Sequence, residues 1–491
     1  MTLLLLACAE PEPEPYSYPQ LDEARPELRG GGGPAVSFGE EELWQNCAFL
    51  RGDDDKEYDH HNLVMPYRGH LVLPWSPEYG SGGLSLFDMS DPCDPVKEGE
   101  GWAQLMRETH ALGFLHLPEG EDQAGDYAAT TGTLGIQIWD LTTLESPEEL
   151  VYLQLPDIFY PDAYARPVLS LFWAHPWMYV AGADNGIYVV NTEQLDQPEL
   201  VARYTWDPPL RAAGVFVIGN TLLVHAAEGT HVAMLDVSDP SEPQPIPGGE
   251  FHTADGEGET WEAYHGNVAG DLALFARKES GGGVMVWDWS DPTQPAYLGD
   301  IWTEGGNGGY VFYDEGFAFT GESHWGKVYD LRDLDNITEV GTGYLAGDLD
   351  TNTPYGNVMI LSVDDDAEND QSTAVVPWTA EPDSTGPTLL RVEPKDGQTD
   401  VALTARVGLG FDEPLEPSSV FGGSVTLHDD QGLAIEGWGS AQENVATFSP
   451  KQELKPGTTY TIEVVPDGIE DINGNRTEQS WTSTFTTLGG S

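Results

Sequence analysis

The chain has 491 residues, of which 83 are Asp or Glu and 20 are Lys or Arg, so its formal net charge is −63. Acidity on this scale repels phosphate backbones and anionic lipid surfaces, which argues against nucleic acids and against membranes recognised through charge. The 39% of hydrophobic residues, together with 57 Gly and 36 Pro, favours a folded, turn-rich β protein over a disordered chain.

The N-terminus begins with a short apolar segment, which reads LLLLAC over residues 3–8. It is too short to span a bilayer, which takes about 20 residues. Residues 5–8 resemble a bacterial lipobox, in which the cysteine becomes the lipid-bearing first residue of the mature protein. The basic residues that normally precede such a signal are missing, so a fortuitous apolar start is the alternative. The resemblance implies that residues 1–8 are a signal remnant and that Cys8 carries lipid, which would anchor the protein in the bacterial cell envelope, at the outer membrane or cell surface.

Residues 9–56 follow as a segment rich first in Pro and Glu and then in Gly. Residues 9–34 show no apolar period, and such sequences form semi-rigid or flexible spacers, so we interpret them as a tether that holds a folded body away from a surface. Cys47 and Cys93 are the cysteines left once Cys8 is assigned to lipid. In an exported protein we expect them to form one disulfide, with two unpaired thiols as the alternative.

Residues 57–380 repeat one phrase: alternating apolar residues, an Asp or Asn, and a turn that often contains Pro. Residues 83–92, GLSLFDMSDP, are one copy. The spacing averages about 48 residues, which is typical of a four-stranded propeller blade and too long for a leucine-rich solenoid. A further unit starts near residue 356, so we expect a β-propeller of seven blades, with six as the alternative. The anchors of the repeat are Asp88, Asp140, Asn191, Asp236, Asp288 and Asp330.

The repeat resembles the bacterial LVIVD repeat, a β-propeller family of exported proteins, over roughly residues 57–380. The resemblance implies the fold and an address outside the cytoplasm, and it implies no particular ligand. The anchor carboxylates stand at strand ends, where they can accept backbone N–H groups of the following turn. We expect this structural role rather than catalysis, because a catalytic carboxylate would not recur in every blade.

Residues 381–387 form a polar hinge, and residues 388–488 contain about seven short alternating runs separated by turn signals. This pattern predicts a β-sandwich. The phrases FDEP at 411–414 and GIEDINGN at 468–475 resemble a bacterial Ig-like domain, in which the second is a structural turn. The resemblance implies a spacer or an adhesive module.

No motif of a hydrolase, a metalloprotease or a nucleotide-binding loop occurs in the chain. Calcium is the one cofactor that the sequence suggests, since Asp348, Asp350 and Asn352 place oxygen ligands at alternate positions. With so many acids, chance matches of this kind are frequent.

Three histidines stand where innermost strands are expected to begin: His61, His110 and His265. Propeller geometry gathers these strand starts at one mouth of the central channel, where imidazoles can converge on a metal or an anion. The alternative is that each satisfies backbone groups at its own blade end.

The predicted function is therefore a non-enzymatic, monomeric lipoprotein of the cell envelope. Its propeller serves as a binding scaffold for a protein or carbohydrate ligand, it touches the membrane only through the lipid anchor, and the Ig-like module acts as a spacer. A propeller hydrolase or lyase with a histidine, acid or metal site in the channel is the alternative, and a secreted layer protein that assembles with calcium is a third hypothesis.

Overall fold

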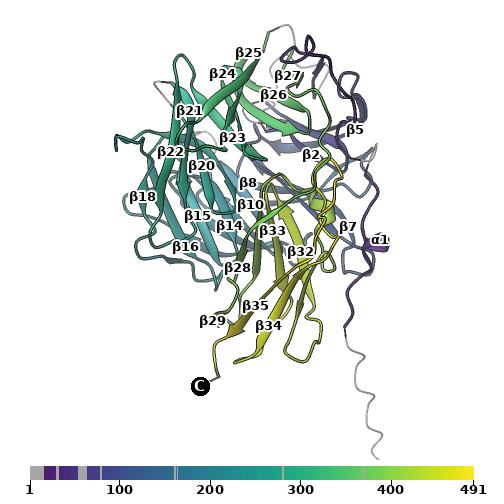
Figure 1. The fold of residues 1–491 in the computed structure, drawn as a ribbon, viewed down its shortest axis with the longest axis vertical. Helices are drawn as coiled ribbons and strands as arrows, with labels where there is room; N and C mark the ends of the chain where they lie inside the picture. Colours follow the sequence, from purple (N-terminus) through teal and green to yellow (C-terminus); the bar gives the residue numbers. More distant parts are fainter. Residues whose placement is uncertain are drawn as a thin grey trace, which may run out of the picture.

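The repeats form a ring of seven blades, and the C-terminal β-sandwich packs against one face of that ring (Figure 1). The fold class predicted from the sequence is confirmed. None of the helices within the described ranges has the length and apolar character needed to cross a membrane. The computed structural model describes residues 16–28, 32–52, 63–77, 80–159, 162, 164–278, 281–365, 367–368 and 371–490.

The first five blades follow the chain in order, each antiparallel with its first strand innermost, and one pairing between Met106 and Gly132 joins blades 1 and 2 into a single sheet. Blade 1 contains β2 (Met65–Tyr67), β3 (His70–Trp75), β4 (Gly80–Asp88) and β5 (Val96–Met106). Blade 2 contains β6 (Leu112–Leu117), β7 (Gly125–Gly132), β8 (Gly135–Asp140) and β9 (Glu148–Gln154). Blade 3 contains β10 (Ser170–Ala174), β11 (Trp177–Ala181), β12 (Ile187–Asn191) and β13 (Glu199–Tyr204).

Blade 4 contains β14 (Ala212–Ile218), β15 (Thr221–Ala226), β16 (His231–Asp236) and two short outer strands, β17 (Gln244–Pro245) and β18 (Phe251–His252), which both pair with β16. Blade 5 contains β19 (Ala263–Ala269), β20 (Leu272–Arg277), β21 (Gly282–Asp288) and β22 (Ala296–Thr303).

Blades 6 and 7 share one sheet because two long strands each fill two positions. In blade 6, β24 supplies the second and third strands and the start of β25 the fourth. The end of β25 is the innermost strand of blade 7. The strands of this sheet are β23 (Gly308–Asp314), β24 (Phe317–Asp330), β25 (Thr338–Tyr355), β26 (Val358–Asp365), β27 (Thr373–Pro377) and β1 (Ala48–Leu50).

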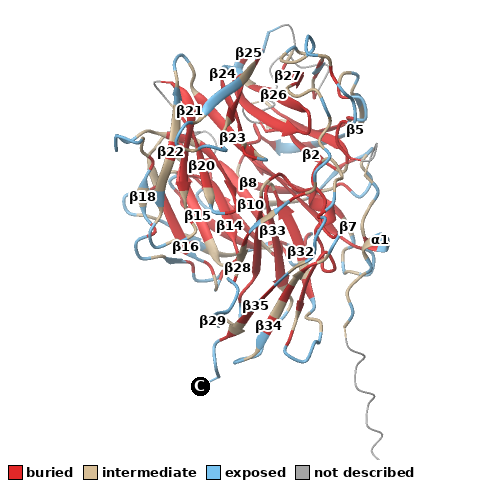
Figure 2. Ribbon diagram, in the orientation of Figure 1, coloured by how far each residue is buried: buried red, intermediate tan, exposed pale blue. Residues whose placement is uncertain are grey.

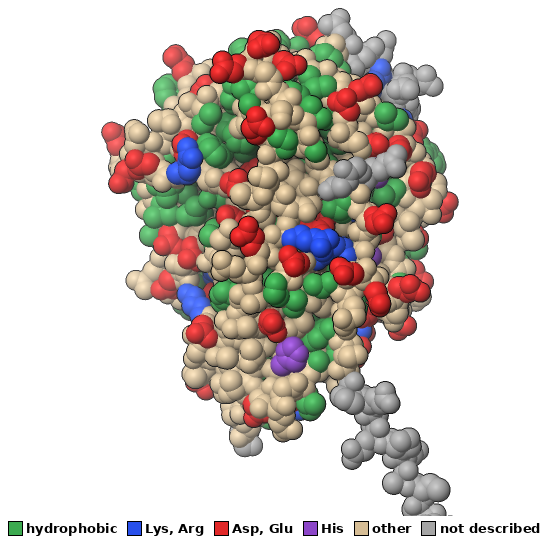
Figure 3. All heavy atoms as spheres, turned by 45° about the vertical axis from the view of Figure 1, so that its right-hand side comes forward, with side chains coloured by type: hydrophobic (Ala, Val, Ile, Leu, Met, Phe, Trp, Pro, Cys, Tyr) green, Lys and Arg blue, Asp and Glu red, His purple; other side chains and the backbone are tan. Residues whose placement is uncertain are grey.

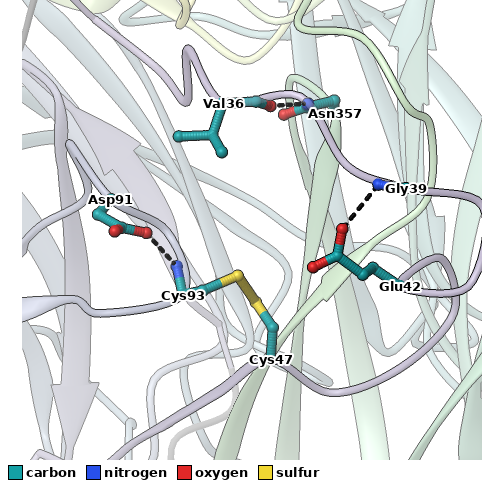
Figure 4. Close-up of a disulfide and its surroundings, with 7 residues drawn as sticks. All are labelled: Val36, Gly39, Glu42, Cys47, Asp91, Cys93 and Asn357. Atoms are coloured by element: carbon teal, nitrogen blue, oxygen red, sulfur yellow. Dashed lines mark hydrogen bonds between the residues drawn. A yellow bond between two sulfur atoms is a disulfide. The ribbon is translucent and has the colours of Figure 1, made fainter.

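The ring is closed by β1, which comes from the N-terminal side of blade 1 and pairs with β27 as the outer strand of blade 7. The sequence had indicated a start at residue 57. The propeller instead starts at Ala48. Next to this strand, the sulfur atoms of Cys47 and Cys93 are bonded, with their Cα atoms 5.0 Å apart (Figure 4). Asp91 accepts the backbone N–H of Cys93 at 3.1 Å, so the bridge joins the closing strand to an ordered turn of blade 1.

Most strands of the propeller and the sandwich are buried (Figure 2). Their apolar side chains form the cores between neighbouring blades and inside the sandwich. Successive residues of an inner strand face the blades on either side, so both faces are buried and the strands read as nearly continuous apolar runs. Three tryptophans, Trp139, Trp173 and Trp289, are among the largest fully buried side chains of these layers.

The six repeat anchors accept backbone N–H groups two residues further on, at the end of the third strand in blades 1 to 6. This local bond explains why either Asp or Asn can stand at the anchor position, because both side chains supply the accepting oxygen. The distances are 2.8 Å from Ser90 to Asp88, 2.8 Å from Thr142 to Asp140, 2.8 Å from Glu193 to Asn191, 2.8 Å from Ser238 to Asp236, 2.8 Å from Ser290 to Asp288 and 3.0 Å from Arg332 to Asp330.

The Ig-like domain has two four-stranded sheets packed face to face. The first contains β28 (Leu389–Glu393), β30 (Val407–Phe411), β33 (Val445–Pro450) and β32 (Gly437–Gln442). The second contains β29 (Gln398–Val401), β35 (Trp481–Thr487), β34 (Thr459–Val464) and β31 (Val425–His428), and a short 3-10 helix η2 (Pro417–Ser419) follows β30.

Residues 16–28, part of the segment predicted to be a tether, lie along the Ig-like domain (Figure 1). The hydroxyl of Tyr18 lies 2.9 Å from the carbonyl of Leu427, and Arg25 pairs with Glu470 at 2.9 Å. These residues include one helical turn, α1 (Leu21–Ala24). The tether interpretation is therefore wrong for residues 16–28, because buried aromatic and ionic contacts hold them. Cys8 and the rest of the lipobox-like segment lie outside the described residues.

Candidate functional site

The central channel has two mouths, one where the innermost strands begin and one where they end. We name them the N-terminal mouth and the C-terminal mouth. The first sheet of the Ig-like domain covers the C-terminal mouth, with β30, β32 and β33 against the innermost strands β6, β10, β14 and β19. A ligand that enters the channel therefore does so from the N-terminal mouth.

Two glycines of β30 bring the domains into close contact. A Cβ atom on Gly408 would lie 1.9 Å from the backbone nitrogen of Gly219, which is in the turn after β14. A Cβ atom on Gly410 would lie 2.8 Å from the Cα of Gly270, in the turn after β19. The absence of side chains on this face of β30 lets the two backbones touch.

A buried amide completes the interface over blade 3. Gln442 accepts the backbone N–H of Trp173 at 2.9 Å and donates to the carbonyl of Leu171 at 3.0 Å. Both partners belong to the innermost strand β10. A spacer would extend away from the propeller. The Ig-like domain is instead docked on the propeller, so its interpretation as a spacer does not fit this packing.

The domain junction is expected to respond to pH through Glu443. Burial raises the pKa of its carboxyl from 4.5 to about 7, against the opposing hydrogen bond from Asn267. Because the folded pKa is the higher one, this group's stabilisation is complete below pH 4.5 and is lost as the pH rises through 7. Glu443→Gln, which keeps an acceptor for Asn267, should raise the free energy of unfolding at pH 8 by roughly 1–3 kcal/mol and change it little at pH 5. Urea unfolding at the two pH values measures this, and an equal effect at both would contradict it.

A cluster of buried polar side chains occupies the N-terminal mouth, just before β6. The imidazole Nε2 of His110 lies 2.6 Å from a carboxylate oxygen of Glu108, and its Nδ1 lies 3.0 Å from the hydroxyl of Tyr310 on β23. Arg107 donates to the carbonyl of Val168 at 3.0 Å, which joins the start of blade 2 to that of blade 3. We call Arg107, Glu108, His110, Tyr264, His265, Tyr310 and Asp350 the mouth cluster.

His265 reaches the same tyrosine from blade 5. Its ring stacks on Tyr310 with the ring centroids 4.2 Å apart, and His225 lies edge-on to it at 6.0 Å. Burial holds the pKa of His265 well below 6.5 and lowers that of His225 to about 4, so both rings are neutral at pH 7. The structure thus brings His110 and His265 together at Tyr310.

His61, the third histidine predicted at this mouth, lies outside the described residues. Within the described ranges, no group of three metal-ligating side chains forms at this mouth. A histidine-based metal centre of His110 and His265 is therefore not what the geometry shows.

A strand takes the place of the calcium loop expected at Asp348, Asp350 and Asn352. These residues lie in strand β25, whose pairing with β26 shifts register between Asp348 and Thr351. Asp348 is exposed, and Asn352 donates to the carbonyl of Lys327 at 3.0 Å. Asp350 is buried in the mouth cluster, and its burial, opposed by Lys278, raises its pKa to about 7.

Exposed aromatic side chains lie on the outer strands of four consecutive blades, 5, 6, 7 and 1. Trp102, Trp302 and Tyr344 stand at one constant spacing after the anchors of their blades, and they are 59%, 49% and 48% exposed. Large aromatic side chains that are exposed on several neighbouring blades are candidates for a binding surface. We call this set, together with Trp325 on the third strand of blade 6, the aromatic belt: Phe49, Trp102, Trp302, Trp325 and Tyr344.

Acidic side chains are scattered over the face of the molecule shown in Figure 3, with few Lys and Arg among them. The net charge of −63 is thus a property of the surface rather than of one tail. Such a surface disfavours anionic ligands and leaves neutral or basic ones as the classes that can approach.

The two domains resemble different groups of known proteins. Residues 383–487 match a family model described as a bacterial Ig-like domain. No curated protein matches the chain. Solved structures of similar fold include the WD40 repeats of RRP9, with a TM-score of 0.50 and 10% identity over 70% of this chain and 98% of that one. Others are the periplasmic gluconolactonase PpgL of Pseudomonas aeruginosa, at 0.45 and 9% over 56% and 83%, and the designed protein Ika8, at 0.42 and 10% over 68% and 99%.

These comparisons define the class of protein. The chain is a β-propeller joined to a bacterial Ig-like domain, and that domain indicates an extracytoplasmic bacterial protein. The disulfide agrees with this address, since such bonds persist in oxidising compartments. At 10% identity, the likeness to RRP9 shows the propeller fold alone.

Proposed function

We propose that this protein is a non-enzymatic binding scaffold of the bacterial cell envelope, whose propeller binds its ligand through the aromatic belt. The observation that carries this proposal is the recurrence of an exposed aromatic residue at the same register in blades 1, 5 and 6. A folded chain leaves a large ring exposed to water at some cost, so its repetition at one register on neighbouring blades supports a binding role.

A carbohydrate is the ligand class that fits the belt best. Four of the belt's rings stand on the outer strands of different blades, and Trp325 lies beside Tyr344 on the third strand of blade 6, so the belt is not one continuous apolar patch. Flat rings can stack on the C–H faces of sugars, and carboxylates accept hydrogen bonds from sugar hydroxyls. A neutral polysaccharide also escapes the repulsion that the acidic surface imposes on anions.

The finer parts of the proposal rest on the sequence. Residues 5–8 support a lipid anchor on Cys8, and the repeat grammar supports membership of the LVIVD-type propellers. Monomeric assembly belongs to the same set of proposals. The order of residues 16–28 along the Ig-like domain gives the anchor a defined starting point on the folded body.

The mouth cluster does not favour the alternative of a propeller hydrolase or lyase. Both ring nitrogens of His110 already face partners, Glu108 and Tyr310. The structure shows no carboxylate of the described residues hydrogen-bonded to His265, whose Nε2 has no hydrogen-bond partner. A neutral histidine without an acid beside it lacks the partner that orients a general base.

The double variant Trp102→Ala, Trp302→Ala is expected to lose binding to carbohydrate. Each stacked ring contributes about 1 kcal/mol, so the two together lower affinity about 30-fold. A glycan array followed by binding isotherms on the best polysaccharide, using the full chain, measures the effect.

Tyr164→Ala is the matched control, because Tyr164 is equally exposed but lies between blades 2 and 3, away from the belt. It should bind as the wild-type chain does. Equal affinity of the double variant, or an array with no carbohydrate bound, would overturn the proposed ligand class.

A further inference from the structure

Three carboxylates meet where the hinge joins the Ig-like domain. Asp383 comes from the hinge, Glu413 follows β30, and Asp471 lies in the turn after β34. One oxygen from each lies within 4.8 Å of the other two. In the part of the chain that the structure describes, no other group of three His, Cys, Asp or Glu side chains meets in this way.

The cluster is largely buried and lacks a cationic partner among the described residues. Asp471 is fully buried and Glu413 is 2% exposed. None of the ion pairs between described residues joins a Lys, an Arg or a His to any of the three. Two more acids, Asp314 and Asp412, lie near enough for their charges to act on Glu413.

The three carboxylates differ in how well the protein satisfies them. Asp471 accepts the backbone N–H groups of Asn473 and Asn475, each at 2.8 Å, and Asp383 accepts the side-chain amide of Asn475 at 3.0 Å. One oxygen of Glu413, in contrast, is buried and has no hydrogen-bond partner. A buried, unsatisfied carboxylate oxygen is costly, and the carboxyl that carries it faces the other two acids.

The electrostatics agree with a missing positive charge. Burial and the repulsion from the neighbouring acids raise the pKa values of Glu413 and Asp471 well above the usual range. Without a counter-charge, the cluster must take up protons at neutral pH or lose stability.

We propose that Asp383, Glu413 and Asp471 bind a divalent cation, with Ca²⁺ as the best fit. The three side chains offer only oxygen, which suits a hard cation and not zinc or copper. Calcium accepts six to eight oxygen ligands in flexible geometry, so carboxylates that also accept hydrogen bonds can serve it.

This ion would hold the hinge against the Ig-like domain beside the propeller. The backbone carbonyl of Asp412, next to Glu413, accepts the N–H of Glu315 at the turn of blade 6 at 2.7 Å. Binding would therefore fix the domain junction at the C-terminal mouth. The proposal does not depend on the aromatic belt, which lies on the outer strands of the blades.

The first measurement is calorimetry of calcium added to the EDTA-treated full chain at pH 7.5. It should show one calcium ion bound at the cluster of each chain. At 100 times the dissociation constant, calcium should raise the melting temperature by about 3 °C. Glu413→Gln should weaken calcium binding at least about tenfold. It should also raise the melting temperature in EDTA, because it removes an acid that must otherwise stay protonated or repel its neighbours.

Glu478→Gln is the matched control, since Glu478 is an exposed acid of the same domain, and its calcium response should equal that of the wild-type chain. Asp383→Asn, at a half-buried position of the hinge, tests the same site if Glu413→Gln does not fold. A wild-type chain with no calcium-dependent shift would overturn the proposal. An unchanged calcium response in Glu413→Gln or Asp383→Asn would do so too, because the ion would then bind elsewhere on the acidic surface.

Discussion

We expect a double variant with serine at Cys47 and Cys93 to lose about 4 kcal/mol of folding free energy. The bridge spans 46 residues of sequence, and the entropy of closing a loop of that length is of this order. It also holds β1, a strand of only three residues, against the outer edge of blade 7. Losing it opens the ring at its weakest point, so urea unfolding should begin at lower concentration and amide exchange at Ala48–Leu50 should accelerate.

Reduction of the wild-type chain provides the control. Dithiothreitol should lower wild-type stability to that of the double variant and leave the double variant unchanged. A loss below about 1 kcal/mol, with β1 still protected from exchange, would show that strand pairing alone closes the ring. The packing of neighbouring blades against each other would then be enough to keep the ring closed without the disulfide.

The sequence predicted the propeller because its signals are local and repeated. Apolar runs before Asp88 and Asp288 that are nearly continuous reflect burial on both faces of a blade, and the Asp that follows reflects a turn closed two residues later. Such features recur in six of the seven blades at a nearly regular spacing, which makes them visible without any long-range information.

Ring closure and domain docking could not be predicted in the same way. Strand β1 is very short and pairs with β27, which comes from the opposite end of the propeller sequence, so it carries no local signal. The contacts by which the docked Ig-like domain meets the propeller include two glycines of β30 and the buried amide of Gln442. The run Val407–Phe411 alternates Gly with large apolar residues, and this was the available signal that one face of the strand lies against another backbone.

The candidate site was predicted in part. Strand starts led to His110 and His265, and both lie in the mouth cluster. Tyr310 was missed because a tyrosine in a buried strand has the same pattern as a core residue. The aromatic belt was also missed, although aromatics at a constant distance from the anchors were there to be found.

The second large effect is expected from Gly408→Ala, which should separate the Ig-like domain from the propeller. The added methyl group would lie 1.9 Å from the nitrogen of Gly219 and 2.7 Å from the carbonyl carbon of Ile218. Both are backbone atoms that no rotamer change can move, so either the domains part or the turn after β14 distorts. We expect loss of several kcal/mol of docking energy, larger than the roughly 1 kcal/mol of an ordinary core substitution.

Gly489→Ala is the matched control, because a Cβ atom there meets nothing within 4 Å and the chemical change is the same. Small-angle scattering of the two variants should show a larger radius of gyration for Gly408→Ala alone, and proteolysis should cut its hinge at residues 381–387 faster. Because docking buries the C-terminal mouth, the same variant should make Trp173 and Leu171 accessible to exchange while the outer strands stay protected. If Gly408→Ala scatters and exchanges as the control does, the close backbone contact is not what holds the two domains together.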